Sequence, residues 1–117
     1  MERQIRLRRP ADFERVRRGG QSWAHPLLVL AARPNELDET RIGVIASRKV
    51  GHAVDRNRAK RLLRESARRI YPQLVQGWDL VLIARRKILA VQEPQVRAAL
   101  RQLLEQASLL SSQEKTE

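Results

Sequence analysis

Cysteine is absent from this chain of 117 residues, and its absence excludes two kinds of structure at once. Without thiols the chain can form neither a disulfide nor a metal site built on thiolates. A small domain that folds without disulfides suits a reducing compartment, so we expect a cytoplasmic protein.

Long hydrophobic runs are missing as well. No stretch of the sequence approaches the roughly 20 apolar residues that a helix needs to cross a bilayer. The N-terminal sequence MERQIRLRRPADF has no apolar stretch of the kind found in secretory signal peptides. We therefore expect neither a membrane span nor a secretion signal.

Side chains suited to acid–base or metal chemistry are few. The two histidines, His25 and His52, lie on different segments of the chain. A protein that hydrolyses its substrate would need a paired general acid and base, or clustered carboxylates that hold metal ions. Glu36, Asp38 and Glu39 lie close together in sequence, but such a polar stretch is more typical of a solvated turn than of a metal site. We expect no catalytic residue and no metal site in the protein.

Positive charge, in contrast, is present in large excess. The chain has 24 basic and 13 acidic residues, which gives a formal net charge of +11. Such an excess indicates a polyanionic partner, either a nucleic acid or an anionic membrane surface. Most of the basic residues are Arg, whose planar fork of donors suits phosphate groups and stacks on bases, so nucleic acid is favoured.

The hydrophobic content of 42% is high enough for a folded domain, and the length fits a single one. We expect one domain, suited to binding a nucleic acid, over residues 10–110. A flexible basic arm is expected over residues 1–9 and a polar tail over residues 111–117.

Three helices are predicted from apolar periodicity and from breakers. They are expected over residues 11–18, 56–70 and 93–109, with Asp55 as the N-cap of the second helix. In the first helix, Phe13 and Val16 lie three residues apart and should share an inward face, because such positions are neighbours on a helix.

Strands are predicted over residues 22–33, 41–47 and 78–86. Pro26 cannot donate to a strand ladder, so it should mark a sheet edge, a bulge or a break between two short strands. Because only a short polar loop joins residues 22–33 to residues 41–47, we expect these two segments to pair antiparallel. Helices and strands in this order predict an α+β sandwich with one sheet.

The predicted helix over residues 56–70 separates charge from apolar side chains. On a helical wheel its apolar positions gather on one side: Ala59, Leu62, Leu63, Ala67 and Ile70. A stripe of cations without an anion follows a different side, with Asn57 beside it: Arg56, Lys60, Arg61, Arg64 and Arg68. Arg58 falls on a third side, near Glu65.

A solvated helix face is the simplest explanation of such a run, but solvated faces tend to mix charges of both signs at positions i and i+4. Like charges at that spacing destabilise a helix by a few tenths of a kcal/mol per pair, roughly. A membrane-binding helix would carry bulky aromatic residues on its apolar side, and this one carries Ala and Leu. The pattern therefore favours a ridge that binds the phosphates of a nucleic acid.

Residues 41–65, RIGVIASRKVGHAVDRNRAKRLLRE, resemble the bacterial ribonuclease P protein family. That family carries the pattern R-x-G-x-x-x-S-[RK]-K-x-G-x-A-V-x-R-N-R-x-K-R-x-x-R-E, and every position of it is filled here. Two flanking patterns also match: F-x-x-V-x-x-x-G at residues 13–20, and D-x-V-x-I-A-R at residues 79–85. The resemblance covers roughly residues 6–109.

The resemblance implies a fold and a function. The fold would be a single αβββαβα sandwich, similar to the second domain of a ribosomal small-subunit protein. Its one sheet would be mostly antiparallel and would contain a left-handed β-α-β crossover, against the usual right-handed rule. The protein would be the accessory subunit of an endoribonuclease that frees the mature 5′ end of tRNA. The catalytic RNA subunit would perform the chemistry with Mg²⁺, and the protein alone would not be catalytic.

The resemblance also implies two binding surfaces. The catalytic RNA would be held by one protein molecule through Arg48, Lys49, Arg56, Asn57, Arg58, Lys60, Arg61, Arg64 and Arg68. The single-stranded 5′ leader of precursor tRNA would lie in a cleft at Phe13, Arg17, Leu27, Val29 and Ala31. Aromatic residues are common in this family at the places held here by Arg17 and Ala31. Stacking on leader bases should therefore contribute less in this chain, and Arg17 could stack by its guanidinium plane or hold a phosphate.

Two rival functions remain open from the residues alone. A ribosomal or other structural RNA-binding protein could carry the same basic helix, and it would copurify with ribosomal RNA. A protein nuclease would cleave precursor tRNA in the absence of any RNA subunit.

Overall fold

The computed structural model describes residues 5–111. The three α-helices are α1 (Pro10–Gly19), α2 (Ala53–Ile70) and α3 (Glu93–Gln106). The four strands are β1 (Gln21–Ala24), β2 (Leu28–Pro34), β3 (Arg41–Ile45) and β4 (Trp78–Ala84). Short 3₁₀ helices follow α2 at Tyr71–Gln73 (η2) and β4 at Arg86–Ala90 (η3). These elements confirm the predicted α+β order, and Pro26 lies in a break between β1 and β2, which is one of the three alternatives left open by the sequence.

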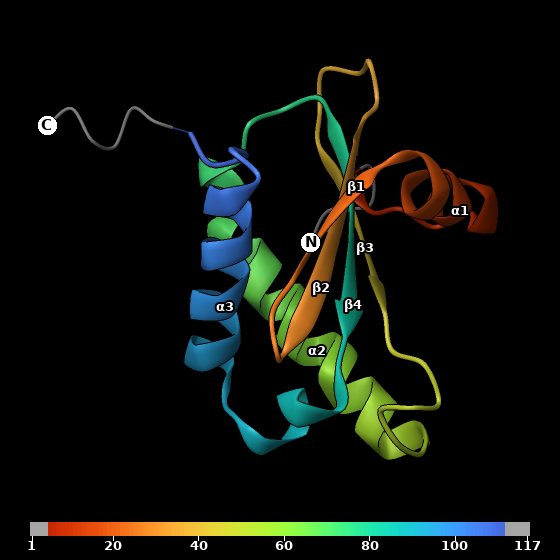
Figure 1. Ribbon diagram of the computed structural model, residues 1–117, viewed down its shortest axis with the longest axis vertical. Helices are drawn as coiled ribbons and strands as arrows, with labels where there is room; N and C mark the ends of the chain where they lie inside the picture. Colours follow the sequence, from red (N-terminus) through yellow and green to blue (C-terminus); the bar gives the residue numbers. More distant parts are fainter. Residues whose placement is uncertain (1–4, 112–117) are drawn as a thin grey trace, which may run out of the picture.

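The sheet has the strand order β1-β2-β4-β3 (Figure 1). β2 pairs antiparallel with β1 and with β4, and β3 pairs parallel with β4. The predicted antiparallel pairing of residues 22–33 with residues 41–47 is therefore wrong. β4 lies between these two segments because its side chains are buried on both faces, which suits a central strand.

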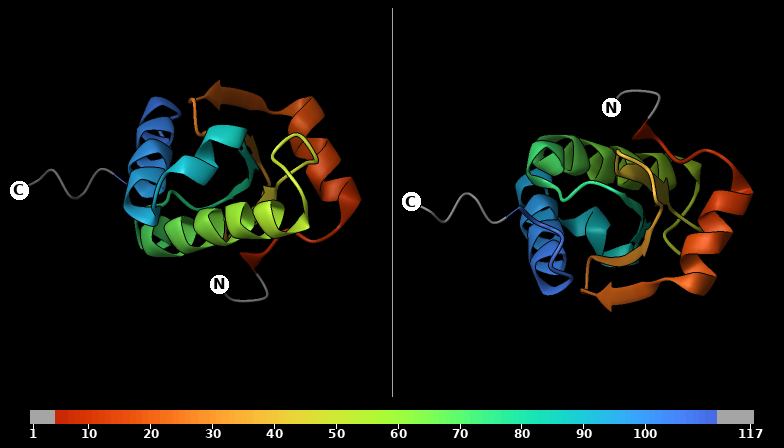
Figure 2. Two further views of the ribbon diagram at one scale, coloured as in Figure 1. Left: turned by 90° about the horizontal axis from the view of Figure 1, so that it is seen from below. Right: turned by 90° about the horizontal axis from the view of Figure 1, so that it is seen from above.

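The parallel pair β3 and β4 is joined through α2. When the molecule is seen with α2 in front of the sheet and these strands pointing upward, β4 lies to the left of β3 (Figure 1, Figure 2). The crossover is thus left-handed, which is rare among β-α-β units. α2 and α3 lie side by side on one face of the sheet, and α1 covers the other (Figure 1).

Side-chain alternation along the strands builds a separate core on each face. The larger core faces α2 and α3 and includes Leu30 and Leu82 from the sheet and Leu63 from α2. The smaller core, under α1, contains four buried residues: Leu7, Val16, Ala31 and Val81. Phe13 packs against this smaller core, so the predicted inward face of α1 is confirmed.

The predicted start of α2 needs a correction. The helix begins at Ala53 with His52 at the N-cap position, so Asp55 lies in the first turn and does not cap it. Gly51 precedes it with φ of 152°, and a side chain at this position would collide with the carboxylate of Asp55. Asp55 instead places its negative charge near the positive end of the helix dipole.

The N-terminal segment also differs from expectation. From residue 5 it lies along β3: Arg6 forms a parallel bridge with Ile42, and the backbone N–H of Leu7 donates to the carbonyl oxygen of Ile42 at 2.9 Å. Ile5 and Leu7 are buried. The flexible arm expected over residues 1–9 therefore does not extend to residues 5–9, and residues 1–4 lie outside the described part. Of the polar tail, only Ser111 is described.

A buried carboxylate ties β3 to β4 and to α1. Asp79 accepts hydrogen bonds from Arg41 Nε at 2.9 Å and Arg41 Nη2 at 2.7 Å, and a third from Asn35. Arg41 Nη1 also lies 4.0 Å from Asp12 on α1. The hydrogen bonds to Asp79 raise the pKa of Arg41 above its ordinary value. This paired geometry joins β3 to β4 where the two strands begin, at the register pair Arg41 and Asp79. No helix within residues 5–111 is long and apolar enough to span a membrane.

Candidate RNA-binding surface

α2 presents an apolar side to the core and a cationic side to the surface. Its buried residues are Ala59, Leu63, Ser66, Ala67 and Ile70, and Leu62 packs partly against the same core. The separation of faces predicted from the helical wheel is therefore confirmed.

The nine predicted RNA-binding side chains lie on α2 and on the loop before it. Six of them are exposed: Arg48, Lys49, Asn57, Arg61, Arg64 and Arg68. The other three are half-buried: Arg56, Arg58 and Lys60. None is fully buried. All nine can reach a partner at the surface.

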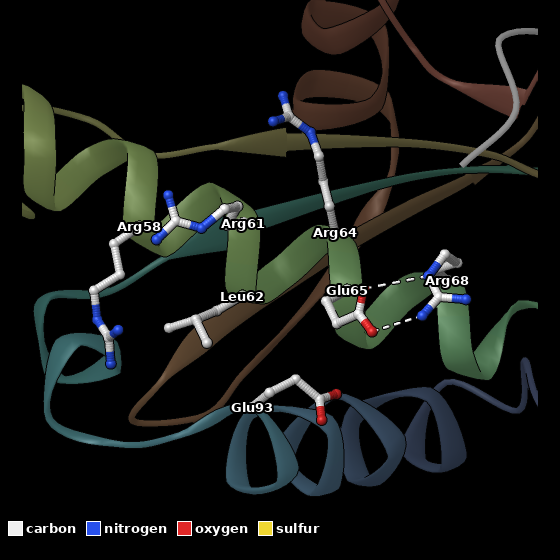
Figure 3. A pocket seen from close by; sticks show the side chains of 7 residues that line it. All are labelled: Arg58, Arg61, Leu62, Arg64, Glu65, Arg68 and Glu93. Carbon is white, nitrogen blue, oxygen red and sulfur yellow. Dashed lines mark hydrogen bonds and ion pairs between the residues drawn. The ribbon is translucent and has the colours of Figure 1, made fainter.

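A hollow of about 410 Å³ lies where α2 passes the start of α3 (Figure 3). Arg58, Arg61 and Arg68 line it from α2, and Glu93 lines it from α3. Arg58 donates to the carbonyl oxygen of Val91 at 3.2 Å, so its guanidinium is held at the rim of the hollow. Arg64 extends to the side of α2 that faces away from Glu93 (Figure 3).

Arg68 differs from the other predicted contacts because its partner within the described residues is a carboxylate. It donates to Glu65 from Nε at 3.2 Å and from Nη2 at 2.6 Å, and Arg69 donates to the same carboxylate at 3.0 Å. These hydrogen bonds lower the pKa of Glu65 and raise the pKa of Arg68. The Glu65 carboxylate therefore lies beside the C-terminal end of the cationic stripe. The helical wheel alone did not indicate this ion pair.

A second hollow, of about 490 Å³, lies at the start of α2. It brings together the predicted Arg48 and Arg56 with His52 and with Arg86 of η3. Arg86 comes from a distant part of the sequence and was not among the predicted residues. It extends the cationic surface beyond the loop and helix that carry the motif.

A third hollow, of about 520 Å³, continues this surface at the end of the sheet. Arg85, Arg86 and Lys87 line it together with His25. The signal for these residues is present in the sequence, since three cations directly follow an apolar strand. His25 itself closes the turn between β1 and β2, because its Nδ1 accepts from the backbone N–H of Leu27 at 3.0 Å.

The five predicted leader-cleft residues do not all lie together. Phe13 and Ala31 belong to the core under α1, and strand alternation places Val29 on the same face as Ala31. Leu27 packs instead against the larger core on the opposite face, because it precedes β2 at the turn. Arg17 is exposed on α1, whereas Ala31 is only 4% exposed and lies beneath other side chains.

A fourth hollow, of about 260 Å³, lies beside Phe13. It is lined by the N-terminal segment, α1, β3 and α2, through Arg6, Leu7, Arg8, Phe13, Ile42, Gly43, Val44 and Arg64. This hollow joins a residue predicted for leader binding, Phe13, to one predicted for catalytic-RNA binding, Arg64. Arg6 and Arg8 were not predicted, because residues 1–9 were expected to form an arm.

The residues present do not fit a protein-bound metal. Within residues 5–111, no group of three or more His, Cys, Asp or Glu side chains is placed to hold a metal ion. The chemistry that the surface offers is the binding of anions by guanidinium groups, which suits phosphodiesters.

Comparison with known sequences gives a family for this surface. A sequence model of the ribonuclease P family matches residues 1–108. A protein of Herpetosiphon aurantiacus named ribonuclease P protein component is 43% identical over 97% of this chain and 93% of its own length. A protein of Dehalococcoides mccartyi with the same name is 44% identical over 99% of this chain and 96% of its own length.

Solved structures agree with the sequences. The RNase P protein of Staphylococcus aureus superposes with a TM-score of 0.81 at 30% identity, covering 92% of this chain and 98% of that one. The RNase P protein of Thermotoga maritima superposes with a TM-score of 0.78 at 35% identity, covering 86% of this chain and 96% of that one. The chain therefore belongs to the bacterial ribonuclease P protein family and is the protein subunit of an endoribonuclease.

Proposed function

We propose that this protein binds the catalytic RNA of ribonuclease P and the 5′ leader of precursor tRNA, and so assists Mg²⁺-dependent removal of the leader. The observation that carries this proposal is the cationic side of α2, which is exposed over most of its length while its apolar side is buried. Of the predicted contacts on this helix, Arg68 is bound to a carboxylate, and Arg56, Lys60, Arg61 and Arg64 have no carboxylate partner within residues 5–111.

The physical contribution of the protein would be charge neutralisation. The catalytic RNA and precursor tRNA are both polyanions, and their approach is opposed by repulsion between phosphates. Each phosphate that an Arg or Lys neutralises releases condensed counterions, so binding is favoured and falls steeply with salt. The hollows around Arg56 and Arg86 extend the same cationic surface across the start of α2 and the end of the sheet.

Mg²⁺ would be held by RNA and would supply Lewis-acid catalysis at the scissile phosphodiester. The protein's role toward the metal would be indirect, because cations on α2 stabilise the folded RNA that binds it. We place one protein on each catalytic RNA, with residues 10–110 acting as the single RNA-binding domain.

Reconstitution tests the proposal directly. The protein is combined with a bacterial ribonuclease P RNA, and cleavage of precursor tRNA is measured at low and high Mg²⁺. We expect the protein to lower the Mg²⁺ concentration needed for cleavage at the mature 5′ end. The protein should also raise the affinity of the holoenzyme for precursor tRNA more than its affinity for mature tRNA. Cleavage that is unchanged by the protein at every Mg²⁺ concentration would contradict the proposal, as would cleavage by the protein alone.

A further inference from the structure

The hollow where α2 passes the start of α3 presents charges of both signs (Figure 3). Arg58 and Arg61 line it from α2, and neither forms an ion pair within the described residues. Glu93 lines it from α3. This hollow lies on the flank of α2 that faces α3, whereas the hollow beside Phe13 lies on the flank that faces β3. A ligand suited to it would carry both an anionic group and hydrogen-bond donors.

The carboxylate of Glu93 is held in place but keeps room to accept hydrogen bonds. The hydroxyl of Ser66, which is fully buried, donates to its Oε2 at 3.1 Å. The guanidinium groups of Arg69 and Arg97 lie 3.9 Å and 3.6 Å from the carboxylate, beyond hydrogen-bond distance. A carboxylate has about four acceptor positions, so most of those on Glu93 remain for a ligand that enters the hollow.

The other carboxylate of the hollow, Glu65, differs in this respect. Arg68 and Arg69 donate three hydrogen bonds to it, and both of its oxygens accept. Leu62 adds an apolar side chain to the lining and packs on its other side against the core. The hollow therefore combines an acceptor group at Glu93 with an apolar surface and with cations that have no carboxylate partner.

Guanine is the nucleobase whose donors best match one carboxylate. Its N1–H and its N2 amine point the same way along the Watson–Crick edge, so together they can donate to both oxygens of Glu93. Adenine and cytosine place a ring acceptor beside their single amine, and uracil places a carbonyl oxygen on each side of its N–H. These acceptors would face the carboxylate and be repelled by it. A flat base also suits the apolar side chain of Leu62, and the phosphate of the same nucleotide suits Arg58 and Arg61.

We propose that this hollow binds an unpaired guanosine of the catalytic RNA, with the Watson–Crick edge on Glu93 and the phosphate on Arg58 and Arg61. The inference rests on the proposed function, in which these two arginines hold that RNA, and it adds base recognition to a surface otherwise suited to phosphates. Contacts to phosphates position an RNA, and contacts to base edges make its recognition specific. The volume of about 410 Å³ lies within the range of pockets that hold small ligands, about 300–1,000 Å³.

Inosine interference tests the contact, because inosine is guanosine without the N2 amine. The catalytic RNA is transcribed with inosine at random guanosine positions, and the molecules that bind a limiting amount of protein are separated from those that do not. We expect one unpaired position at which inosine weakens binding to the wild type by about tenfold, as for one lost hydrogen bond to a charged group.

Two variants of Glu93 should change the result at that position. With Glu93→Gln the inosine effect should fall to about threefold or less, because the amide has one acceptor oxygen and hydrogen bonds between neutral groups are roughly half as strong. With Glu93→Ala inosine should have no effect there, because the acceptor is already lost. Glu105→Gln removes the same charge from an exposed position of α3 outside the hollow, and it should keep the full tenfold effect.

Guanosines that are paired within the RNA provide the internal reference. Inosine weakens their pairing whichever protein is present, so these positions should respond alike with every variant that still folds and binds. Circular dichroism of each variant checks its fold independently.

Three results would overturn the inference. One is an inosine pattern that is the same for the wild type and Glu93→Ala at every position. Another is loss of the same position in Glu105→Gln. The third is a Glu93-dependent position found only when precursor tRNA, and not the catalytic RNA, carries inosine. Failure of the proposed function would look different, since the wild type would then neither bind the catalytic RNA nor assist cleavage in the same preparation.

Discussion

α2 and α3 perform the same structural task with very different surfaces. Both are amphipathic helices that lie side by side on one face of the sheet, and each contributes fully buried aliphatic side chains to the same core. α2 carries seven basic and two acidic residues, whereas α3 carries two of each. Packing on the sheet therefore does not require the charge of α2. The excess charge of α2 is therefore left for the RNA that the proposed function places against this helix.

The inner faces of the two helices should prove energetically alike. Leu63 of α2 and Leu103 of α3 are both completely buried in the larger core. We expect Leu63→Ala and Leu103→Ala each to lower the free energy of unfolding by about 2–5 kcal/mol, through lost burial and the cavity left behind. Urea denaturation followed by circular dichroism measures both values. A loss below about 1 kcal/mol for either variant would show that its helix is not part of the cooperative core.

The outer faces should differ in RNA binding. Arg61 is exposed on α2, and Arg97 on α3 lies 3.6 Å from Glu93. We expect Arg61→Gln to weaken binding of the catalytic RNA by about three- to tenfold at moderate salt, and to reduce the slope of log K against log salt by about 0.7–0.9. Filter binding across a salt series measures both quantities.

Arg97→Gln is the matched control for that series, because it removes the same charge from the neighbouring helix. Its affinity and salt slope should stay at the wild-type values. If the two variants lose the same affinity, the charge of α2 acts only through the net charge of the protein. The contrast between the helices would then have no bearing on where RNA binds.

How much of the fold could be predicted depends on whether a feature is local. The two sides of α2 follow from a period of 3.6 residues, so the buried Leu63 and the exposed Arg61 were both predictable. Strand order is not local. A short connection between β2 and β3 suggested a hairpin, but β4 is buried on both faces and takes the place between them. Connection length alone could not reveal this.

The same distinction applies to the site. The cations of residues 48–64 could be predicted because they are adjacent in sequence. Arg86 joins Arg48 and Arg56 only after the chain has folded, and Arg6 reaches Arg64 in the same way. The alternation of apolar and basic residues in I-R-L-R, residues 5–8, was a usable signal for a strand-like segment with one buried side.

The smallest expected effect concerns the carboxylate that ends the stripe on α2. Glu65 accepts hydrogen bonds from Arg68 and Arg69, so its removal should free Arg68 for RNA. We expect Glu65→Gln to raise the affinity for the catalytic RNA by about two- to fivefold at neutral pH, with little change in stability because the ion pair is exposed. Glu105→Gln on α3 makes the same change in net charge at an exposed position and should raise affinity less.

The pH dependence of this effect has a definite sign. The hydrogen bond from Arg68 lowers the pKa of Glu65, so the carboxylate stays charged to a lower pH than an ordinary glutamate. The ion pair is present above the ordinary pKa and is lost as the pH falls through the lowered value. The affinities of the wild type and Glu65→Gln, measured by filter binding between neutral and acid pH, should therefore converge only below the ordinary range of a glutamate. If they converge near neutral pH, or if Glu105→Gln raises affinity equally, then Arg68 is not held back by Glu65.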